Sequence, residues 1–253
     1  MGLQNRKIFL LITVCFLFFS CASRKDYVYV QNIDAASTYA ATDYEMKLKP
    51  DDLLKINVTA ENPEVAVPFN LSQLPTGAIT YAEGQNYLID HLGFINFPII
   101  GKIKLAGLTT SDANKQLVKV ISEYIKNPTI DVRILNFKIS VLGEVTKPGS
   151  YYVQGERISV FEGLSLAGDL GVYGKRKNVL IIHEEDGKKT YNRVDITKAD
   201  FLNSPQYYLS QNDIIFVEAN KTKINSSVVG PNTSVILSVV SILITLSVIL
   251  FRS

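Results

Sequence analysis

The sequence predicts an α+β protein that is mostly β-strand and that ends in a C-terminal transmembrane helix. Apolar and polar residues alternate in several short stretches, such as 54–58, with the period of half-buried strands. One longer stretch, 117–125, instead repeats its apolar residues at helical spacing. Residues 235–251 are apolar enough to enter a membrane. These patterns place the strands and a covering helix in the middle of the chain and a membrane segment at its end.

The N-terminus predicts a lipoprotein signal peptide over residues 1–20. Arg6 and Lys7 precede an apolar run that is shorter than the roughly 20 residues of a membrane-spanning helix. Ser20 before Cys21 favours a cleavage that leaves Cys21 as the lipid-bearing (palmitate) N-terminus. An unmodified Cys21 would be a lone thiol in an oxidising compartment. The alternative is a secretory signal that is cut elsewhere, with Cys21 unmodified.

The mature chain has no net charge to attract a polyanion. The sequence has 26 Lys and Arg against 24 Asp and Glu, and Arg6 and Lys7 leave with the signal peptide. Nucleic acid is therefore not an expected partner, because its binding requires a clustered basic patch. His91 and His183 are isolated in the sequence, so no metal or cofactor site is predicted.

The first folded unit is expected over residues 44–136, after a small, polar tether at 21–43. Thr109 with Asp112 marks a helix start, and the residue before Pro128 is a natural stop. The predicted strands are 54–58, 87–90, 94–98, 102–105 and 130–134. The first unit is therefore expected to be a mostly β domain with one covering helix.

A second unit is expected over residues 137–219. Ser159 with Glu162 forms a capping box for a short helix, and Asp186-Gly187 is a strong hairpin signal. The predicted strands are 139–141, 150–153, 179–183, 190–194 and 214–217. Residues 220–230 are expected to be a linker to a C-terminal membrane helix over 231–253.

Few side chains suggest catalysis. Asp51 and Asp52 could be paired carboxylates, but a turn before a strand is the simpler explanation. Two tyrosine pairs, 151–152 and 207–208, could stack on sugars, although on strands each pair is expected to give one core and one surface ring. No nucleophile–base pair is recognisable, so the chain is not predicted to be an enzyme.

The order of motifs resembles the bacterial outer-membrane polysaccharide export proteins of the Wza type. The motifs are 49–53, 87–90 with Gly93, 97–101, 106–109, 127–128, 141–145, 147–149, 166–168 and 209–217. The resemblance implies an export domain followed by a β-grasp-like soluble-ligand-binding (SLBB) domain. Where the family usually has Pro-Gly-Asp, this chain has Pro50-Asp51-Asp52, so the turn must form without glycine.

The resemblance also implies a function. Members of the family form a homo-oligomeric ring that carries capsular polysaccharide or exopolysaccharide through the outer membrane, with their main domains in the periplasm. They cooperate with an inner-membrane polysaccharide co-polymerase that has a tyrosine-kinase part. The alternative for this chain is a monomeric envelope lipoprotein that binds sugar or acts as a scaffold without forming a pore.

The C-terminal helix carries the residues that distinguish a channel from an anchor. Ser234, Ser238, Ser241 and Thr245 follow one another at spacings that place them on one stripe, and Arg252 falls on the same side. In a simple anchor, these hydroxyls would bond back to their own helix or form a small-residue packing face. In a channel, the stripe would face neighbouring helices or a pore.

Overall fold

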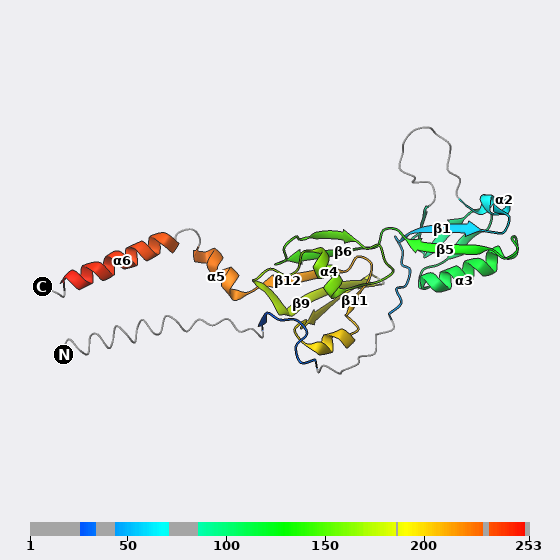
Figure 1. Ribbon diagram of the computed structural model, residues 1–253. Coiled ribbons are helices and arrows are strands. Elements are labelled where there is room, and N and C mark those ends of the chain that lie inside the picture. Colours follow the sequence, from blue (N-terminus) through cyan, green and yellow to red (C-terminus); the bar gives the residue numbers. More distant parts are fainter. Residues whose placement is uncertain (1–25, 34–43, 71–85, 186, 230–232, 251–253) are drawn as a thin grey trace, which may run out of the picture.

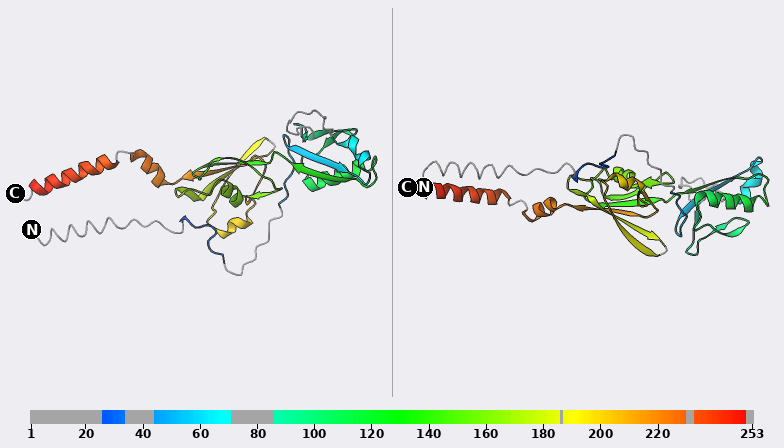
Figure 2. Two further views of the ribbon diagram at one scale, coloured as in Figure 1. Left: turned by 45° about the horizontal axis from the view of Figure 1, so that its top comes forward. Right: turned by 90° about the horizontal axis from the view of Figure 1, so that it is seen from below.

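The computed structural model describes residues 26–33, 44–70, 86–185, 187–229 and 233–250. Its architecture is α+β and mostly strand, as the sequence predicts (Figure 1). Two folded units follow one another, and two helices extend from the second unit on the side away from the first (Figure 2). Each unit has its own cluster of buried apolar side chains. The protein is therefore elongated, with its C-terminal helices at one end.

The first unit combines an antiparallel sheet, in the order β2-β1-β5, with a β3–β4 hairpin and one long helix. Its elements are β1 (Leu53–Thr59), α2 (Pro63–Ala66), the 3-10 helix η2 (Val67–Phe69), β2 (Asn86–Leu88), β3 (Phe94–Phe97), β4 (Gly101–Lys104), α3 (Thr110–Ile121) and β5 (Thr129–Ile134). The alternation in β1 buries Leu54, Ile56 and Val58, which confirms the predicted strand. Their side chains face α3, which completes the core of this unit.

Helix α3 begins where the sequence predicts and ends earlier. The Thr109 side chain accepts a hydrogen bond from the Asp112 backbone N–H at 3.1 Å, which caps the helix. Its buried face is Ala113, Leu117 and Ile121, spaced four residues apart. The helix ends at Ile121 and not at Pro128. Turns and bends of the backbone occupy residues 122–127.

The turn before β1 is made without glycine, at the position where the family usually has one. Asp51 takes a φ of +69°, in the left-handed region that favours glycine and tolerates Asp and Asn. The side-chain amide of Asn136 donates to the Asp51 carbonyl at 2.8 Å and holds this conformation. The departure from the family pattern is therefore accommodated by a residue type that can adopt the same backbone geometry.

The second unit is a mixed sheet in the order β10-β9-β12-β6-β7. Its elements are β6 (Lys138–Gly143), β7 (Gly149–Tyr152), β8 (Ile158–Ser159), α4 (Val160–Leu166), β9 (Gly174–Glu185), β10 (Lys188–Val194), the 3-10 helix η3 (Ala199–Asn203), β11 (Tyr208–Leu209) and β12 (Ile214–Ala219). β12 runs parallel to β6 and antiparallel to β9. The predicted hairpin is confirmed: β9 and β10 pair from Glu185 and Lys188 onward.

Helix α4 lies over one face of this sheet (Figure 1). Ser159 and Glu162 form the predicted capping box, with both reciprocal hydrogen bonds present. Gly143, at the end of β6, has a φ of +92°, and a Cβ there would stand 2.0 Å from the Val217 carbonyl oxygen. Only glycine fits at this close approach of β6 and β12.

Two segments that the sequence presents as connectors are structured. Within the expected tether, the Gln31 backbone N–H donates to the Thr197 carbonyl at 2.7 Å, and Tyr29 packs against the core of the second unit. The expected linker 220–230 contains helix α5 (Lys221–Val229). Neither segment has an apolar periodicity that would have revealed these contacts.

The predicted C-terminal transmembrane helix requires a correction. Residues Thr233–Leu250 form helix α6. Among the helices of the described residues, however, none is long and apolar enough to cross a membrane. The prediction of a membrane-spanning helix over 231–253 is therefore not supported.

Candidate functional site: the C-terminal helices and the pocket beside them

Helix α5 is fixed to the second unit by the residue that precedes it. The Asn220 side chain accepts a hydrogen bond from the Lys223 backbone N–H at 3.0 Å and so caps α5. The Asn220 backbone N–H donates to the Tyr173 carbonyl at 2.8 Å. The Lys223 ammonium lies 5.2 Å from the centre of the Tyr173 ring. The direction of the C-terminal helices is thus set by contacts with the loop before β9.

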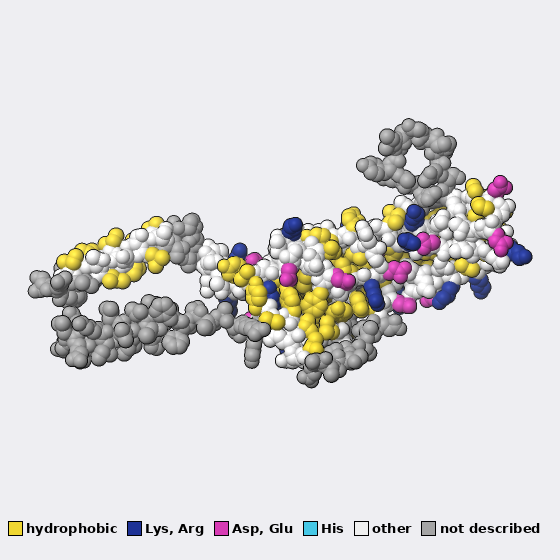
Figure 3. Space-filling model, viewed as in Figure 1, with side chains coloured by type: hydrophobic (Ala, Val, Ile, Leu, Met, Phe, Trp, Pro, Cys, Tyr) yellow, Lys and Arg dark blue, Asp and Glu magenta, His cyan; other side chains and the backbone are white. Residues whose placement is uncertain are grey.

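Helix α6 exposes large apolar side chains around its circumference (Figure 3). The described ones are Val235, Ile236, Leu237, Val239, Val240, Ile242, Leu243, Ile244, Leu246 and Ile249. Each such side chain gains roughly 1.5–3 kcal/mol when it is removed from water. A contiguous apolar surface of this kind marks a region that another surface covers.

Two hydroxyls of the α6 stripe form hydrogen bonds within the helix. The Ser238 hydroxyl donates to the Ser234 carbonyl at 2.8 Å, and the Thr245 hydroxyl donates to the Ser241 carbonyl at 2.9 Å. Such bonds cost a helix little. The structure therefore places these four residues on one helix, as predicted, while Arg252 and Cys21 lie outside the described residues.

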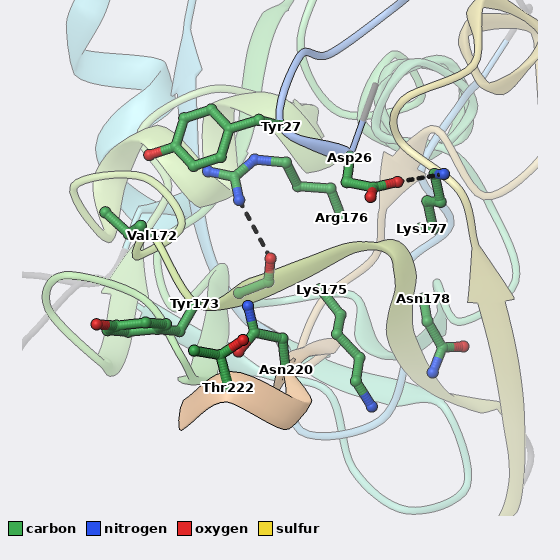
Figure 4. Close-up of a pocket in the computed structure, with 11 residues that line it drawn as sticks. Asp26, Tyr27, Val172, Tyr173, Lys175, Arg176, Lys177, Asn178, Asn220 and Thr222 are labelled. Atoms are coloured by element: carbon green, nitrogen blue, oxygen red, sulfur yellow. Dashed lines mark hydrogen bonds and ion pairs between the residues drawn. The ribbon is translucent and has the colours of Figure 1, made fainter. Parts of the chain in front are cut away.

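A pocket of about 580 Å³ lies where α5, the start of β9 and the N-terminal segment meet (Figure 4). It is lined by Asp26, Tyr27, Val172, Tyr173, Gly174, Lys175, Arg176, Lys177, Asn178, Asn220 and Thr222. Asp26 and Lys177 form an ion pair at 2.5 Å across one side. The pocket therefore lies between the N-terminal segment that begins at Asp26 and the start of helix α5.

Arg176 is the buried side chain that holds the N-terminal segment at this pocket. It is 4% exposed, and its guanidinium stacks 4.1 Å from the centre of the Tyr27 ring and 5.4 Å from that of Tyr29. It also donates to the Gly174 carbonyl at 3.1 Å. The Tyr29 hydroxyl donates to Asp169 at 2.5 Å. Residues 26–33 are thus attached by aromatic and polar contacts, which sequence periodicity cannot reveal.

Glu218 ties three strands together next to the pocket. Its carboxylate accepts hydrogen bonds from Lys175 at 2.9 Å and from Arg193 at 2.7 Å. The bond from Lys175, and then that from Arg193, lower the pKa of Glu218 to about 2. The strands β9, β10 and β12 therefore share one charged cluster at this end of the sheet.

Asp52, one of the two carboxylates considered as a pair, forms part of the turn before β1. Asp52 accepts a hydrogen bond from the Lys49 backbone N–H at 2.8 Å, and burial raises its pKa to about 6. His183, on β9, contacts the carboxylate of Asp213 at 2.6 Å, and burial raises the pKa of Asp213. The Lys49 ammonium donates to the Glu184 carbonyl at 3.3 Å, which joins the two units. In the described part of the chain, no group of three His, Cys, Asp or Glu residues is placed to hold a metal ion.

The two tyrosine pairs behave differently. Tyr152 is exposed and Tyr151 is half-buried, as alternation on a strand predicts. Tyr207 and Tyr208 are both half-buried, so the prediction of one core and one surface ring is wrong for this pair. Their rings pack edge to face at 4.9 Å in a cluster with Phe161. β11 is only two residues long, so strand alternation does not control them.

The comparisons with known proteins agree with the sequence motifs. Residues 40–135 match the family described as polysaccharide biosynthesis/export protein. Two curated relatives, from Ralstonia solanacearum and Ralstonia nicotianae (strain ATCC BAA-1114 / GMI1000), both carry the description EPS I polysaccharide export outer membrane protein EpsA. They are 26% identical to this chain over 216 and 215 residues.

These alignments cover 80% of this chain and 56% and 55% of the relatives, so the chain spans about half the length of the curated relatives it matches. The resemblance to the Wza-type export family is thereby confirmed, and the family match lies in the first folded unit and the segment before it.

Proposed function

We propose that this chain is a subunit of an oligomeric outer-membrane channel that exports capsular polysaccharide or exopolysaccharide. The observation that carries the proposal is the family match of residues 40–135, on a chain that also presents an exposed apolar helix at its other end. Both relatives are described as polysaccharide export outer membrane proteins, and this description supports the same role.

The anchor and orientation form part of this proposal. Cys21 would carry the lipid, and the two folded units would lie in the periplasm. The attachment of residues 26–33 to the second unit supports this arrangement, because it keeps the second unit close to the anchored N-terminus. An inner-membrane polysaccharide co-polymerase with a tyrosine-kinase part would be the partner at the far end of the periplasmic body.

The second unit would act as an SLBB domain of the β-grasp kind. Its mixed sheet, with α4 on one face and parallel strands β6 and β12 at the centre, supports this assignment. The assembly would move polymer without chemical change, so the chain is proposed to be a transport component and not an enzyme.

Helix α6 would pack with the α6 helices of other copies. Ser234, Ser238, Ser241 and Thr245 have small side chains, and two of their hydroxyls are already satisfied within the helix. Small residues on one stripe allow helix backbones to approach closely. In a ring, this stripe, together with Arg252, would face the neighbouring helices and the axis along which polymer passes.

A gene deletion tests the proposal. Cells that lack this chain should retain polysaccharide in the periplasm and lose it from the surface and medium. The wild-type gene should restore export, and Cys21→Ser should restore less of it because the anchor is lost. Normal surface polysaccharide in the deletion strain would contradict the proposed function.

One observation supports the alternative, in which the chain is a monomeric envelope lipoprotein. The back-bonded hydroxyls of Ser238 and Thr245 need no neighbour, as in a passive anchor. The two functions differ in oligomeric state, which the measurement at the end of the Discussion determines.

A further inference from the structure

The loop between α4 and β9 ends in apolar side chains that are exposed to water. Val172 is 65% exposed, and Tyr173 is 37% exposed. Tyr27 of the N-terminal segment, which is 48% exposed, lines the same pocket as these two residues. Single exposed apolar residues are ordinary, but a cluster of them marks a region that another surface covers. Tyr27, Val172 and Tyr173 are hereafter the loop-tip patch.

The backbone of this loop is held on both sides of Val172. The Gly171 backbone N–H donates to the Glu144 carbonyl at 3.0 Å. The Asn220 backbone N–H donates to the Tyr173 carbonyl at 2.8 Å. The loop cannot turn Val172 inward without breaking these hydrogen bonds, so the fold itself presents the patch to its surroundings.

The side chains of the loop-tip patch point to one side of the pocket (Figure 4). In this view, the hydroxyls of Tyr27 and Tyr173 lie on that side, with Val172 between them. The Tyr27 ring is held in place because the Arg176 guanidinium stacks 4.1 Å from its centre. Tyrosine has an apolar ring and a polar tip, and it is enriched at membrane–water interfaces. The patch therefore has the composition of a surface that contacts a membrane.

The lysines around the patch do not select an anionic partner, because carboxylates neutralise them. The pairs are Lys177–Asp26 at 2.5 Å, Lys175–Glu218 at 2.9 Å and Lys223–Glu144 at 3.8 Å. A partner bound through charge would have to compete with these carboxylates. We therefore expect the patch to bind through its apolar side chains.

The loop-tip patch lies at the end of the second unit where the N-terminal segment meets α5 (Figures 1 and 2). The exposed apolar side chains of α6 follow α5 in the chain. Cys21 precedes Asp26 by five residues, and a stretch of that length spans at most about 18 Å. A lipid on Cys21 would thus keep a membrane surface within reach of the patch.

We propose that the loop-tip patch rests in the headgroup region of the membrane that holds the lipid of Cys21. This inference rests on the proposed function, because it takes Cys21 as the anchor. A lipid alone fixes where the chain is attached to a membrane and not how the chain is oriented. A second contact at the patch would set the orientation of the second unit and direct the first unit away from the membrane.

Tryptophan fluorescence tests the contact, because the chain contains no tryptophan of its own. The lipid-bearing full chain with Val172→Trp is reconstituted with vesicles of phosphatidylethanolamine and phosphatidylcholine. Part of the phosphatidylcholine carries bromine on its acyl chains, either near the headgroup or near the chain end. Val67→Trp is the matched control, because Val67 lies on the first unit and is similarly exposed, at 60%.

Emission from position 172 should shift to the blue and should be quenched more by bromine near the headgroup than by bromine near the chain end. Position 67 should show neither change. A blue shift without quenching would mean that protein covers the loop, and it would overturn the inference, as would stronger quenching by chain-end bromine. Flotation of the wild type separates the failures: a chain that does not float with vesicles refutes the proposed anchor, whereas a floating chain with position 172 unquenched refutes the membrane contact alone.

A second reporter tests whether apolar contact or charge holds the patch. In Tyr173→Trp, the added change Val172→Asp should remove most of the quenching, because a carboxylate opposes entry into the membrane. The matched change Val67→Asp should leave the quenching as it is. Replacing part of the phosphatidylcholine with phosphatidylglycerol should also have no effect, because the nearby lysines are paired. Quenching that survives Val172→Asp, or that requires phosphatidylglycerol, would contradict the proposal.

Discussion

Asp52 shows how one buried carboxylate can make the stability of the protein depend on pH. It is 1% exposed; one of its oxygens accepts the Lys49 N–H bond, and the other makes no hydrogen bond with the described residues. Burial raises its pKa from 3.8 to about 6. The folded state therefore favours the protonated carboxyl. The stabilisation from protonation is complete below pH 4 and is lost as the pH rises through about 6.

Replacing Asp52 with Asn should remove this loss. Asn can still accept the Lys49 hydrogen bond, and it carries no charge at any pH. Asp52→Asn should match the wild type at pH 4 and exceed it at pH 7 by up to about 3 kcal/mol in the free energy of unfolding. Urea titrations at the two pH values measure the difference. Asp51→Asn, which removes the adjacent exposed charge, is the control; a pH dependence of Asp52→Asn parallel to that of the wild type would contradict this account.

Asp51 tests the turn that replaces the usual glycine. Because its φ is +69°, Asp51→Gly should be neutral or should stabilise the protein by up to about 1 kcal/mol, whereas Asp51→Val should cost about 1–2 kcal/mol. The midpoint of thermal unfolding reports both changes. Equal stability of the Gly and Val variants would show that the turn does not depend on this conformation. The sequence predicts the turn itself, but it does not reveal which of the two aspartates is buried.

At the level of elements, the sequence predicts what local periodicity and capping determine. Strand β1, helices α3 and α4 and the β9–β10 hairpin were predicted because alternation, N-caps and turn residues are local signals. Helix α5 was not predicted, because its residues have no apolar stripe. The attachment of residues 26–33 depends on Arg176, which is distant in the sequence, and the pocket beside it could not be predicted for the same reason.

The hydroxyl stripe of α6 leads to an element-level prediction. Replacing Ser238, Ser241 and Thr245 together with Leu should preserve the helix, because Leu is a better helix former. The larger side chains should nevertheless separate neighbouring α6 helices, so export should fall well below that of the wild type. Secreted polysaccharide is the measurement. A matched variant outside the stripe, with Leu at positions 235, 239 and 242, should export normally, and normal export by the stripe variant would show that the stripe has no role in assembly.

At the level of the whole molecule, the two units are joined by a short polar junction. The Gln211 side chain donates to the Asn136 carbonyl and accepts from the Lys138 N–H, both at 2.8 Å. Asn136 in turn accepts from the Leu53 N–H at 2.9 Å. The resemblance to an export family could be read from the order of the motifs. The polar junction could not, because it joins residues that are far apart in the sequence.

The mass of the native assembly tests the central claim most directly. The full chain, extracted from membranes in mild detergent at neutral pH, should have a protein mass that is a multiple of one subunit, and single-particle images should show closed rings. This result is expected because α6 exposes large apolar side chains that neighbouring copies would cover. A monodisperse monomer that still restores polysaccharide export in the deletion strain would contradict the account.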